Sequence, residues 1–228
     1  MSPPDRPLPL GELLSEAVRI YTRRPWAAFG IGLVEGGAFL LARVSPVLFQ
    51  VLILALAFAA TYAAAARLVS GDSFTEAWAQ VGLRAPALVV LMFVVAVPAV
   101  IALQELFLLI VGGLWLALMA FSIPVAMLER DPEVKNSFDR IAHSLLRSIR
   151  LARAEYLHAL GVIAALIMIN VVLGFALGVA LVGFAENGAV VAAVIVRVVL
   201  APFFFIGLSV LYFEQRARAA VSSPPEAA

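Results

Sequence analysis

Four apolar positions with the spacing i, i+3, i+4, i+7 recur three times along the chain, at an interval of 64 residues. This spacing places the four side chains on one face of a helix. The quartets are Leu10/Leu13/Leu14/Ala17, Phe74/Ala77/Trp78/Val81 and Phe138/Ile141/Ala142/Leu145. Each is followed by enough apolar sequence for two membrane crossings. The pattern therefore predicts three repeats of an amphipathic helix followed by a transmembrane hairpin.

The apolar stretches predict six transmembrane helices, because about 20 apolar residues in a helix span a hydrocarbon core. The stretches are residues 26–42, 46–66, 86–128, 156–184 and 190–213. Residues 86–128 are too long for one crossing and must form a hairpin. Gln104-Glu105 is its favoured turn and Gly112-Gly113 is the alternative, while Glu186-Asn187-Gly188 is the predicted turn of the last hairpin.

Composition agrees with a membrane protein. Hydrophobic residues make up 64% of the chain and charged residues 14%, against about 45–50% apolar residues in soluble domains. We therefore expect an all-α integral membrane protein with a single domain over residues 1–228. Its units are expected at about residues 10–68, 73–130 and 137–218, with disordered tails at 1–9 and 219–228. The absence of cysteine excludes disulfides, thiolate metal sites and cysteine nucleophiles.

Basic residues cluster on one side of the predicted spans. Fourteen of the 16 fall in the N-terminal segment, the second and fourth connections and the C-terminal tail, whereas Arg43 alone falls on the other side. Cytoplasmic segments carry the excess of Arg and Lys. We therefore expect a multi-pass protein of the cell (inner) membrane with both termini and all three quartets in the cytoplasm.

The quartet helices have an alternative interpretation, in which each is a cytoplasmic extension of the following span. Pro25 and Pro86 argue against it at two of the three positions, because proline disrupts a helix interior. Ser73 and Ser137 are candidate N-caps, and Ser73 with Glu76 matches the capping box. We therefore expect separate helices at the membrane surface.

Three polar residues lie within the predicted spans. Glu35 is near the middle of the first span and Arg197 lies about two turns into the last. A charge at the bilayer centre costs roughly 2.5–3.5 kcal/mol on insertion scales, so both should face other helices or water. A structural ion pair is the favoured interpretation, with a substrate or proton path and an unpaired neutral Glu35 as alternatives. For Asn170, a hydrogen bond to another helix is favoured.

Prolines and glycines within the spans predict packing features. Pro98, Pro124 and Pro202 match the broken helices of transporters, although membrane helices tolerate proline generally, which is the favoured reading. Gly32-x-x-x-Gly36 and Gly174-x-x-x-Gly178 allow helices to approach closely.

No catalytic array, phosphate-binding glycine loop or metal-ligand pattern is present, so we expect a protein that is not an enzyme and has no cofactor or metal. The third quartet helix carries the densest positive charge. Its basic residues are Arg140, Arg147, Arg150 and Arg153. Such a cluster attracts anionic lipid headgroups, at about 1 kcal/mol per basic residue. An orientation signal alone is the alternative.

Four segments resemble a known family. They are Leu10-Gly11-Glu12-Leu13-Leu14 with Ala17 and Tyr21, Pro124 to Glu129-Arg130, Arg147-Ser148-Ile149-Arg150-Leu151-Ala152-Arg153 with Tyr156 and Leu160-Gly161, and Leu211-Tyr212-Phe213-Glu214-Gln215-Arg216-Ala217-Arg218. Together they resemble the bacterial polytopic membrane domain that occurs fused to glycerophosphodiester phosphodiesterases and also alone. Ile149, Ala154 and Glu214 stand where the family has Trp, Gly and Asp. Only ten residues follow Arg218, so the resemblance implies a stand-alone membrane domain of unknown function.

These observations lead to two functional hypotheses. The first is a non-catalytic membrane protein that binds lipid or a protein partner through the Arg-rich cytoplasmic face. Membrane lipids are its expected partners, a protein partner or a second copy of the chain is the alternative, and nucleic acid is not expected. The second is a small transporter or permease-like subunit that uses Glu35, Asn170 and Arg197.

Overall fold

The computed structural model describes residues 6–104, 108–129, 137–182 and 188–222, and these are helical with no strand. Six helical stretches are long and apolar enough to cross a membrane, as predicted. The first hairpin is α2 (Pro25–Arg43) with α3 (Val47–Val69), and the last is α10 (Tyr156–Val182) with α11 (Gly188–Ser222). Glu186 and Asn187 of its predicted turn lie outside the described residues, and Gly188 begins α11.

The middle hairpin is assembled from shorter helices. Its first arm is α5 (Ala85–Leu91), the π-helix η1 (Met92–Ala96) and α6 (Val97–Gln104), and its second arm is α7 (Leu109–Met119) with α8 (Ser122–Leu128). The Gly112-Gly113 turn is wrong, because both glycines lie inside α7 and Gly112 packs close to Ala102. The helix instead ends at Gln104, the first residue of the favoured turn, and Glu105 lies outside the described residues.

Two of the intraspan prolines coincide with these interruptions. A proline has no N–H for the carbonyl four residues earlier, and its ring crowds that carbonyl. The π-helix η1 ends two residues before Pro98, and the break between α7 and α8 lies just before Pro124. Pro202 is different, because α11 continues through it.

Three helices precede the hairpins: α1 (Leu10–Arg23), α4 (Phe74–Leu83) and α9 (Ser137–Ala154). Each is separated from the following span by a backbone break, at Arg24, Arg84 and Glu155 respectively. Proline sits in the first turn of the next helix at the first two breaks, where it costs no hydrogen bond. None of the three helices therefore continues directly into its span.

The quartet side chains divide in a similar way in all three helices. Leu13 and Ala17, Ala77 and Val81, and Ile141 are buried, whereas the first members Leu10, Phe74 and Phe138 are exposed. The Ser73–Glu76 capping box is confirmed: the Glu76 N–H donates to Ser73 Oγ at 3.3 Å, and the Ser73 N–H donates to Glu76 Oε2 at 2.9 Å. The hydrogen bond from the Ser73 N–H to the carboxylate lowers the pKa of Glu76. The side chain of Ser137, the other candidate cap, lies outside the described residues.

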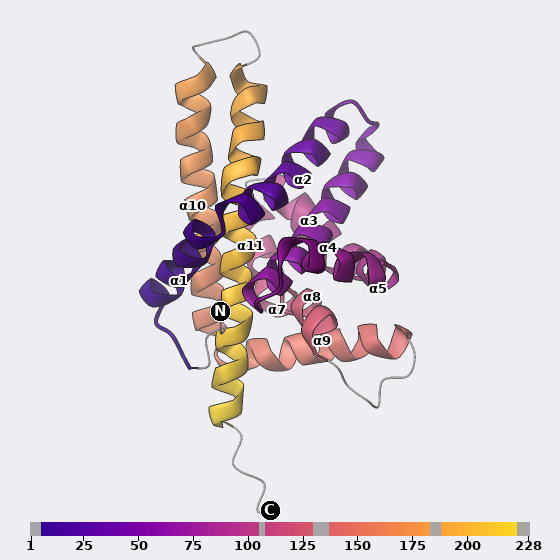
Figure 1. Ribbon diagram of the computed structural model, residues 1–228, viewed down its shortest axis with the longest axis vertical. Helices are drawn as coiled ribbons and strands as arrows, with labels where there is room; N and C mark the ends of the chain where they lie inside the picture. The colour runs from indigo at the N-terminus through magenta and orange to yellow at the C-terminus, as the bar shows by residue number, and fades with distance from the viewer. Residues whose placement is uncertain (1–5, 105–107, 130–136, 183–187, 223–228) are drawn as a thin grey trace, which may run out of the picture.

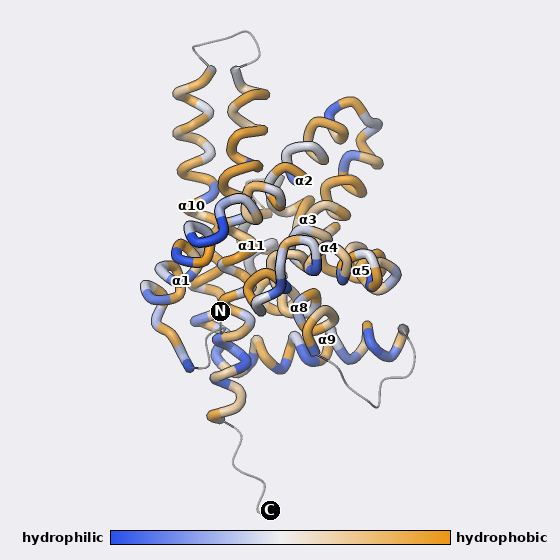
Figure 2. Tube along the Cα trace, in the orientation of Figure 1, coloured by the Kyte–Doolittle hydropathy of each residue, from blue (hydrophilic) through white to orange (hydrophobic). Residues whose placement is uncertain are grey.

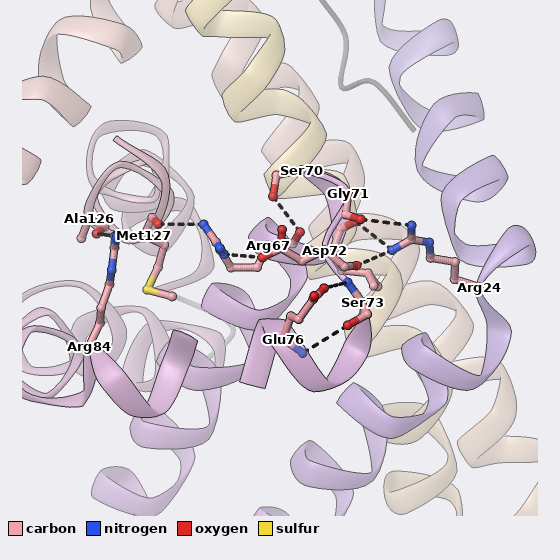
Figure 3. A network of polar contacts seen from close by, with 11 residues as sticks. Arg24, Arg67, Ser70, Gly71, Asp72, Ser73, Glu76, Arg84, Ala126 and Met127 are labelled. Carbon is pink, nitrogen blue, oxygen red and sulfur yellow. Dashed lines mark hydrogen bonds and ion pairs between the residues drawn. The ribbon is translucent and has the colours of Figure 1, made fainter. Parts of the chain in front are cut away.

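Arginines satisfy the carbonyls at the ends of the hairpins (Figure 3). Arg24, at the start of α2, donates to the carbonyls of Leu68, Gly71 and Asp72 at the end of α3. Arg84, at the start of α5, donates in the same way to Ala126 near the end of α8. The last carbonyls of a helix have no partner within it, and its C-terminus favours positive charge. These contacts therefore close each hairpin at its open end.

The end of the molecule where these contacts lie is called the base. It holds the starts of α2, α5 and α10, the ends of α3 and α8, and the charged part of α11 beyond Tyr212. Figure 1 shows α9 crossing the base, with the C-terminal end of α11 beside it. The tips of the α2–α3 and α10–α11 hairpins diverge at the other end. Figure 2 shows hydrophobic residues along these hairpins and most hydrophilic residues toward α1, α9 and the base.

Helix α11 is central and passes very close to α2. A Cβ atom at Gly32 would lie 1.9 Å from the Val198 carbonyl oxygen, and one at Gly36 would lie 2.8 Å from a Val198 methyl group. The Val198 carbonyl would accept a hydrogen bond from the N–H four residues later, but that residue is Pro202, which has no N–H to donate. The glycine face of α2 therefore packs on a carbonyl that the helix leaves open, with a Cα–H of Gly32 directed at it.

We predict that Gly32→Ala destabilises the protein, because its methyl group must push α2 away from the Val198 carbonyl. Overpacking costs typically about 1–3 kcal/mol, and a backbone neighbour gives little room to relax. Thermal unfolding in detergent, followed by size-exclusion chromatography, measures the effect. Gly37→Ala is the matched control, because nothing lies within 4 Å of a Cβ there. Equal melting temperatures for both variants would contradict the close approach.

Candidate functional site

The three polar residues singled out within the spans line one cavity. It has a volume of about 470 Å³ and lies between α2, α3, α10 and α11. Glu35 enters from α2, Asn170 from α10 and Arg197 from α11. The sequence predicted a neighbour for Glu35 in Arg197, but it gave no geometric reason to place Asn170 beside them.

Each carboxylate oxygen of Glu35 has a polar neighbour on another helix. Its side chain is 5% exposed, with Oε2 at 3.8 Å from Arg197 Nη1. The Thr61 hydroxyl of α3 lies 2.8 Å from Oε1 and 2.6 Å from the Ala57 carbonyl oxygen of its own helix, so its single proton is shared between two acceptors. This agrees with the favoured ion-pair prediction, at a length that leaves the two groups in loose contact. Sequence reasoning missed Thr61, although it is the one Ser or Thr within α3 and could have been found for that reason.

Arg197 faces the cavity more openly than its partner. Its side chain is 33% exposed, and its guanidinium carbon lies 4.7 Å from the centroid of the Phe39 ring. This is a cation–π geometry, which favours arginine where water is scarce. Among the described residues, the guanidinium makes no hydrogen bond to the protein beyond its approach to Glu35. Most of its five N–H donors are therefore available to a bound molecule.

Among the residues that the structure describes, Asn170 makes no hydrogen bond to another helix, contrary to the prediction. Its amide nitrogen donates at 3.0 Å to the carbonyl of Leu166, one turn earlier in α10. An amide can bond back to its own helix when no partner helix presents an acceptor at that depth. Asn170 is half-buried at the wall of the cavity, where it adds a third polar group.

The rest of the cavity wall is apolar. Its lining includes a group of small residues and a group of aromatic side chains. The small residues are Gly174, Gly178, Ala189, Ala192 and Ala193, and the aromatic ones are Phe39, Phe58, Phe204 and Phe205. Phe58 and Phe205 pack edge to face, with centroids 4.9 Å apart. The cavity is therefore a hydrophobic space with one cluster of polar groups, which is the usual make-up of a small-molecule site.

The Arg-rich face of α9 lies apart from this cavity. Arg140, Arg150 and Arg153 are exposed. Arg147 instead forms an ion pair with Glu129, with 3.4 Å between Nε and Oε2. Of the four residues predicted as one face, three are therefore exposed cations and the fourth is a half-buried partner of Glu129.

Residues from three of the resembling segments meet at the base. Glu129 also accepts a hydrogen bond from the Tyr212 hydroxyl at 2.9 Å, so its carboxylate joins α9 to α11. The Ser148 hydroxyl donates to the Leu118 carbonyl at 2.7 Å. These short motifs are separate in sequence, and the structure shows that their polar side chains hold helices together.

A second base network surrounds the buried carboxylate of Glu214. It accepts a hydrogen bond from the Leu8 N–H at 3.4 Å and pairs with Arg218. Arg218 also pairs with Glu155 and donates to the Leu8 carbonyl at 3.2 Å. The segment before α1, the start of α10 and the end of α11 are joined by this network. No group of three metal-ligating side chains occurs within the described ranges.

Comparisons with family models, with curated proteins and with solved structures found no match to this chain. The resemblance to the polytopic membrane domain family therefore stays a prediction. The physical reading of the site rests on the geometry of the residues themselves.

We predict that Glu35 and Arg197 are energetically coupled. Each of Glu35→Gln and Arg197→Gln leaves an isolated charge within the membrane-spanning region, whereas the double variant leaves none. The double variant should be more stable than the sum of the single effects implies, by about 0.5–3 kcal/mol, the range for residues in contact. Melting temperatures of the four proteins test this. Additive effects would show that the 3.8 Å approach carries no interaction.

Proposed function

We propose that this chain is a non-catalytic, multi-pass membrane protein that binds lipid through the exposed basic face of α9. The observation that carries the proposal is that α9 lies across the base and exposes Arg140, Arg150 and Arg153 beside large apolar side chains. Phe138 is 79% and Leu146 is 57% exposed on this helix. Cations next to exposed apolar groups suit the boundary between lipid headgroups and acyl chains.

The inner side of α9 supports the same proposal. Ile141, Ser144, Ser148 and Leu151 are buried against the bundle, and Ser148 bonds to α7. The helix is therefore held rigidly, and its cations are presented at a fixed height. Anionic headgroups of the cytoplasmic leaflet are the favoured occupant. A protein partner or a second copy of the chain would use the same face.

We also propose that the chain consists of three related units, each a surface helix followed by a hairpin. The support is a recurring contact at the base. Arg24 and Arg84 occupy the break before the first and second hairpins, and each donates to the carbonyls that end its own hairpin. In the third unit, Glu155 occupies the corresponding break and pairs with Arg218 on the exit of α11.

We predict that the base faces the cytoplasm of a bacterial inner membrane. The chain has no cysteine, so a single one can be introduced cleanly. Thr75 is an exposed residue of α4 at the base, and Val44, which is 82% exposed, lies at the tip of the α2–α3 hairpin. The two single variants are Thr75→Cys and Val44→Cys. A membrane-impermeant thiol reagent added to intact cells should label the cysteine at position 44 alone. Labelling at position 75 alone would reverse the topology.

We predict that Arg150→Gln with Arg153→Gln reduces retention of anionic phospholipid at least about fivefold, since each basic residue near the surface is worth about 1 kcal/mol. Native mass spectrometry of the gently extracted protein, with phosphatidylglycerol or phosphatidylcholine added, measures this. Arg43→Gln, at the opposite end, is the matched control. Unchanged phosphatidylglycerol retention would contradict the proposal, and a bound protein lost from the double variant would favour a partner instead.

A transporter or permease-like subunit is the second candidate. The observation in its favour is that Glu35, Asn170 and Arg197 line one cavity in the membrane-spanning region. Uptake of candidate solutes into reconstituted vesicles distinguishes the two. Transport that disappears in Glu35→Gln and Arg197→Gln and in the double variant, with the fold intact, would favour this candidate.

A further inference from the structure

The cavity is long and follows α11. Its lining runs from Ala189, next to the start of α11, to Phe205. These sixteen residue steps correspond to about 24 Å along a helix. Its volume of about 470 Å³ falls within the range of about 300–1,000 Å³ for small-molecule sites. The cavity is therefore elongated along α11.

The wall toward the hairpin tip leaves room for a hydrocarbon chain. A Cβ atom at Gly178 would meet nothing within 4 Å, and one at Gly174 would touch only the Val196 side chain, at 3.4 Å. The neighbouring outer face of α10 is exposed, with Phe175 at 74% and Val179 at 64%. Within a bilayer this surface faces acyl chains. A lipid chain can therefore lie alongside the glycines without displacing a side chain.

The polar cluster of Glu35, Thr61 and Arg197 indicates what charge a ligand in this cavity would carry. The Glu35 carboxylate already has Thr61 on one oxygen and Arg197 near the other. One nitrogen of the Arg197 guanidinium lies near the Glu35 carboxylate, and the flat face of the group stacks on the Phe39 ring. In the described part of the chain, its remaining N–H donors have no protein acceptor. The Arg197 side chain is 33% exposed and lines the cavity, so these donors face space that a ligand can occupy. A planar guanidinium fork matches the two oxygens of a carboxylate or phosphate.

We propose that this cavity binds a single-chain amphiphile with an oxyanion head group. The head accepts hydrogen bonds from Arg197, and the chain runs along Gly174 and Gly178 toward Ala189. Carboxylate and phosphate monoester heads share this chemistry. The site is separate from the α9 face, so either can fail without the other.

The test uses the full chain in a neutral detergent. Dodecanoate, dodecyl phosphate and dodecyltrimethylammonium carry the same chain on two anionic heads and one cationic head. Displacement of a fluorescent fatty acid measures their affinity. We expect the two anions to bind and the cation not to bind. The stronger of the two anions identifies the class of head group. Equal binding of all three amphiphiles, or preference for the cation, would overturn the proposal.

Two cavity variants separate binding from folding. Gly178→Leu should lower affinity for the anions at least about tenfold, because the side chain enters open space where the chain lies. Gly161→Leu is the matched control on the same helix, because its Cβ also meets nothing within 4 Å and it does not line the cavity. Arg197→Lys keeps the charge but loses the fork, and should weaken binding at least about tenfold. Wild-type affinity in a folded Gly178→Leu protein would refute the site.

The outcome can be read independently of the α9 proposal. Gly178→Leu should leave phosphatidylglycerol retention at the base unchanged, because α9 does not line the cavity. The Arg150→Gln, Arg153→Gln protein should bind dodecyl phosphate like wild type. If one folded variant lost both phosphatidylglycerol retention and dodecyl phosphate binding, the α9 face and the cavity would be parts of one site, and the proposal of a separate site would be wrong.

Discussion

The close approach of α2 to α11 is the constraint on which the rest of the structure depends. Pro202 leaves the Val198 carbonyl without its helical N–H partner, and only glycine at position 32 lets a second helix come close enough to cover it. A carbonyl left open within a membrane needs such a neighbour. Once α2 is fixed there, Glu35 follows one turn later, facing the same side of the contact.

That single contact also creates the cavity. Val198 is adjacent to Arg197 in sequence, so the helix pair that meets at Gly32 brings the guanidinium to within 3.8 Å of Glu35. Toward the tips the two hairpins diverge, as Figure 1 shows. The α10–α11 side of the cavity carries glycine and alanine residues, which leave space that larger side chains would fill. The base does not diverge, because arginine and glutamate side chains join its helix ends.

Much of the architecture was accessible from sequence. The six spans follow from the length of the apolar stretches, and the breaks before α2 and α5 follow from Pro25 and Pro86. The Ser73–Glu76 cap is a local pattern, so it needed no tertiary information. The interruption between α7 and α8 has a local signal in Pro124, although membrane helices also tolerate proline. The break before α10 carries no proline, so nothing comparable in the sequence places it.

The amino-acid sequence by itself determined which segments are apolar enough to cross a membrane and which charges had to lie outside it, because partition into lipid depends on composition over about 20 residues. It also identified Glu35, Asn170 and Arg197 as polar groups that need an explanation. Only the tertiary structure decided that they share a cavity, that Thr61 supports Glu35, and that Arg147 belongs to an internal network while Arg150 and Arg153 are exposed. Which face of each helix meets which neighbour depends on contacts between residues far apart in the chain, and a linear pattern does not contain those distances.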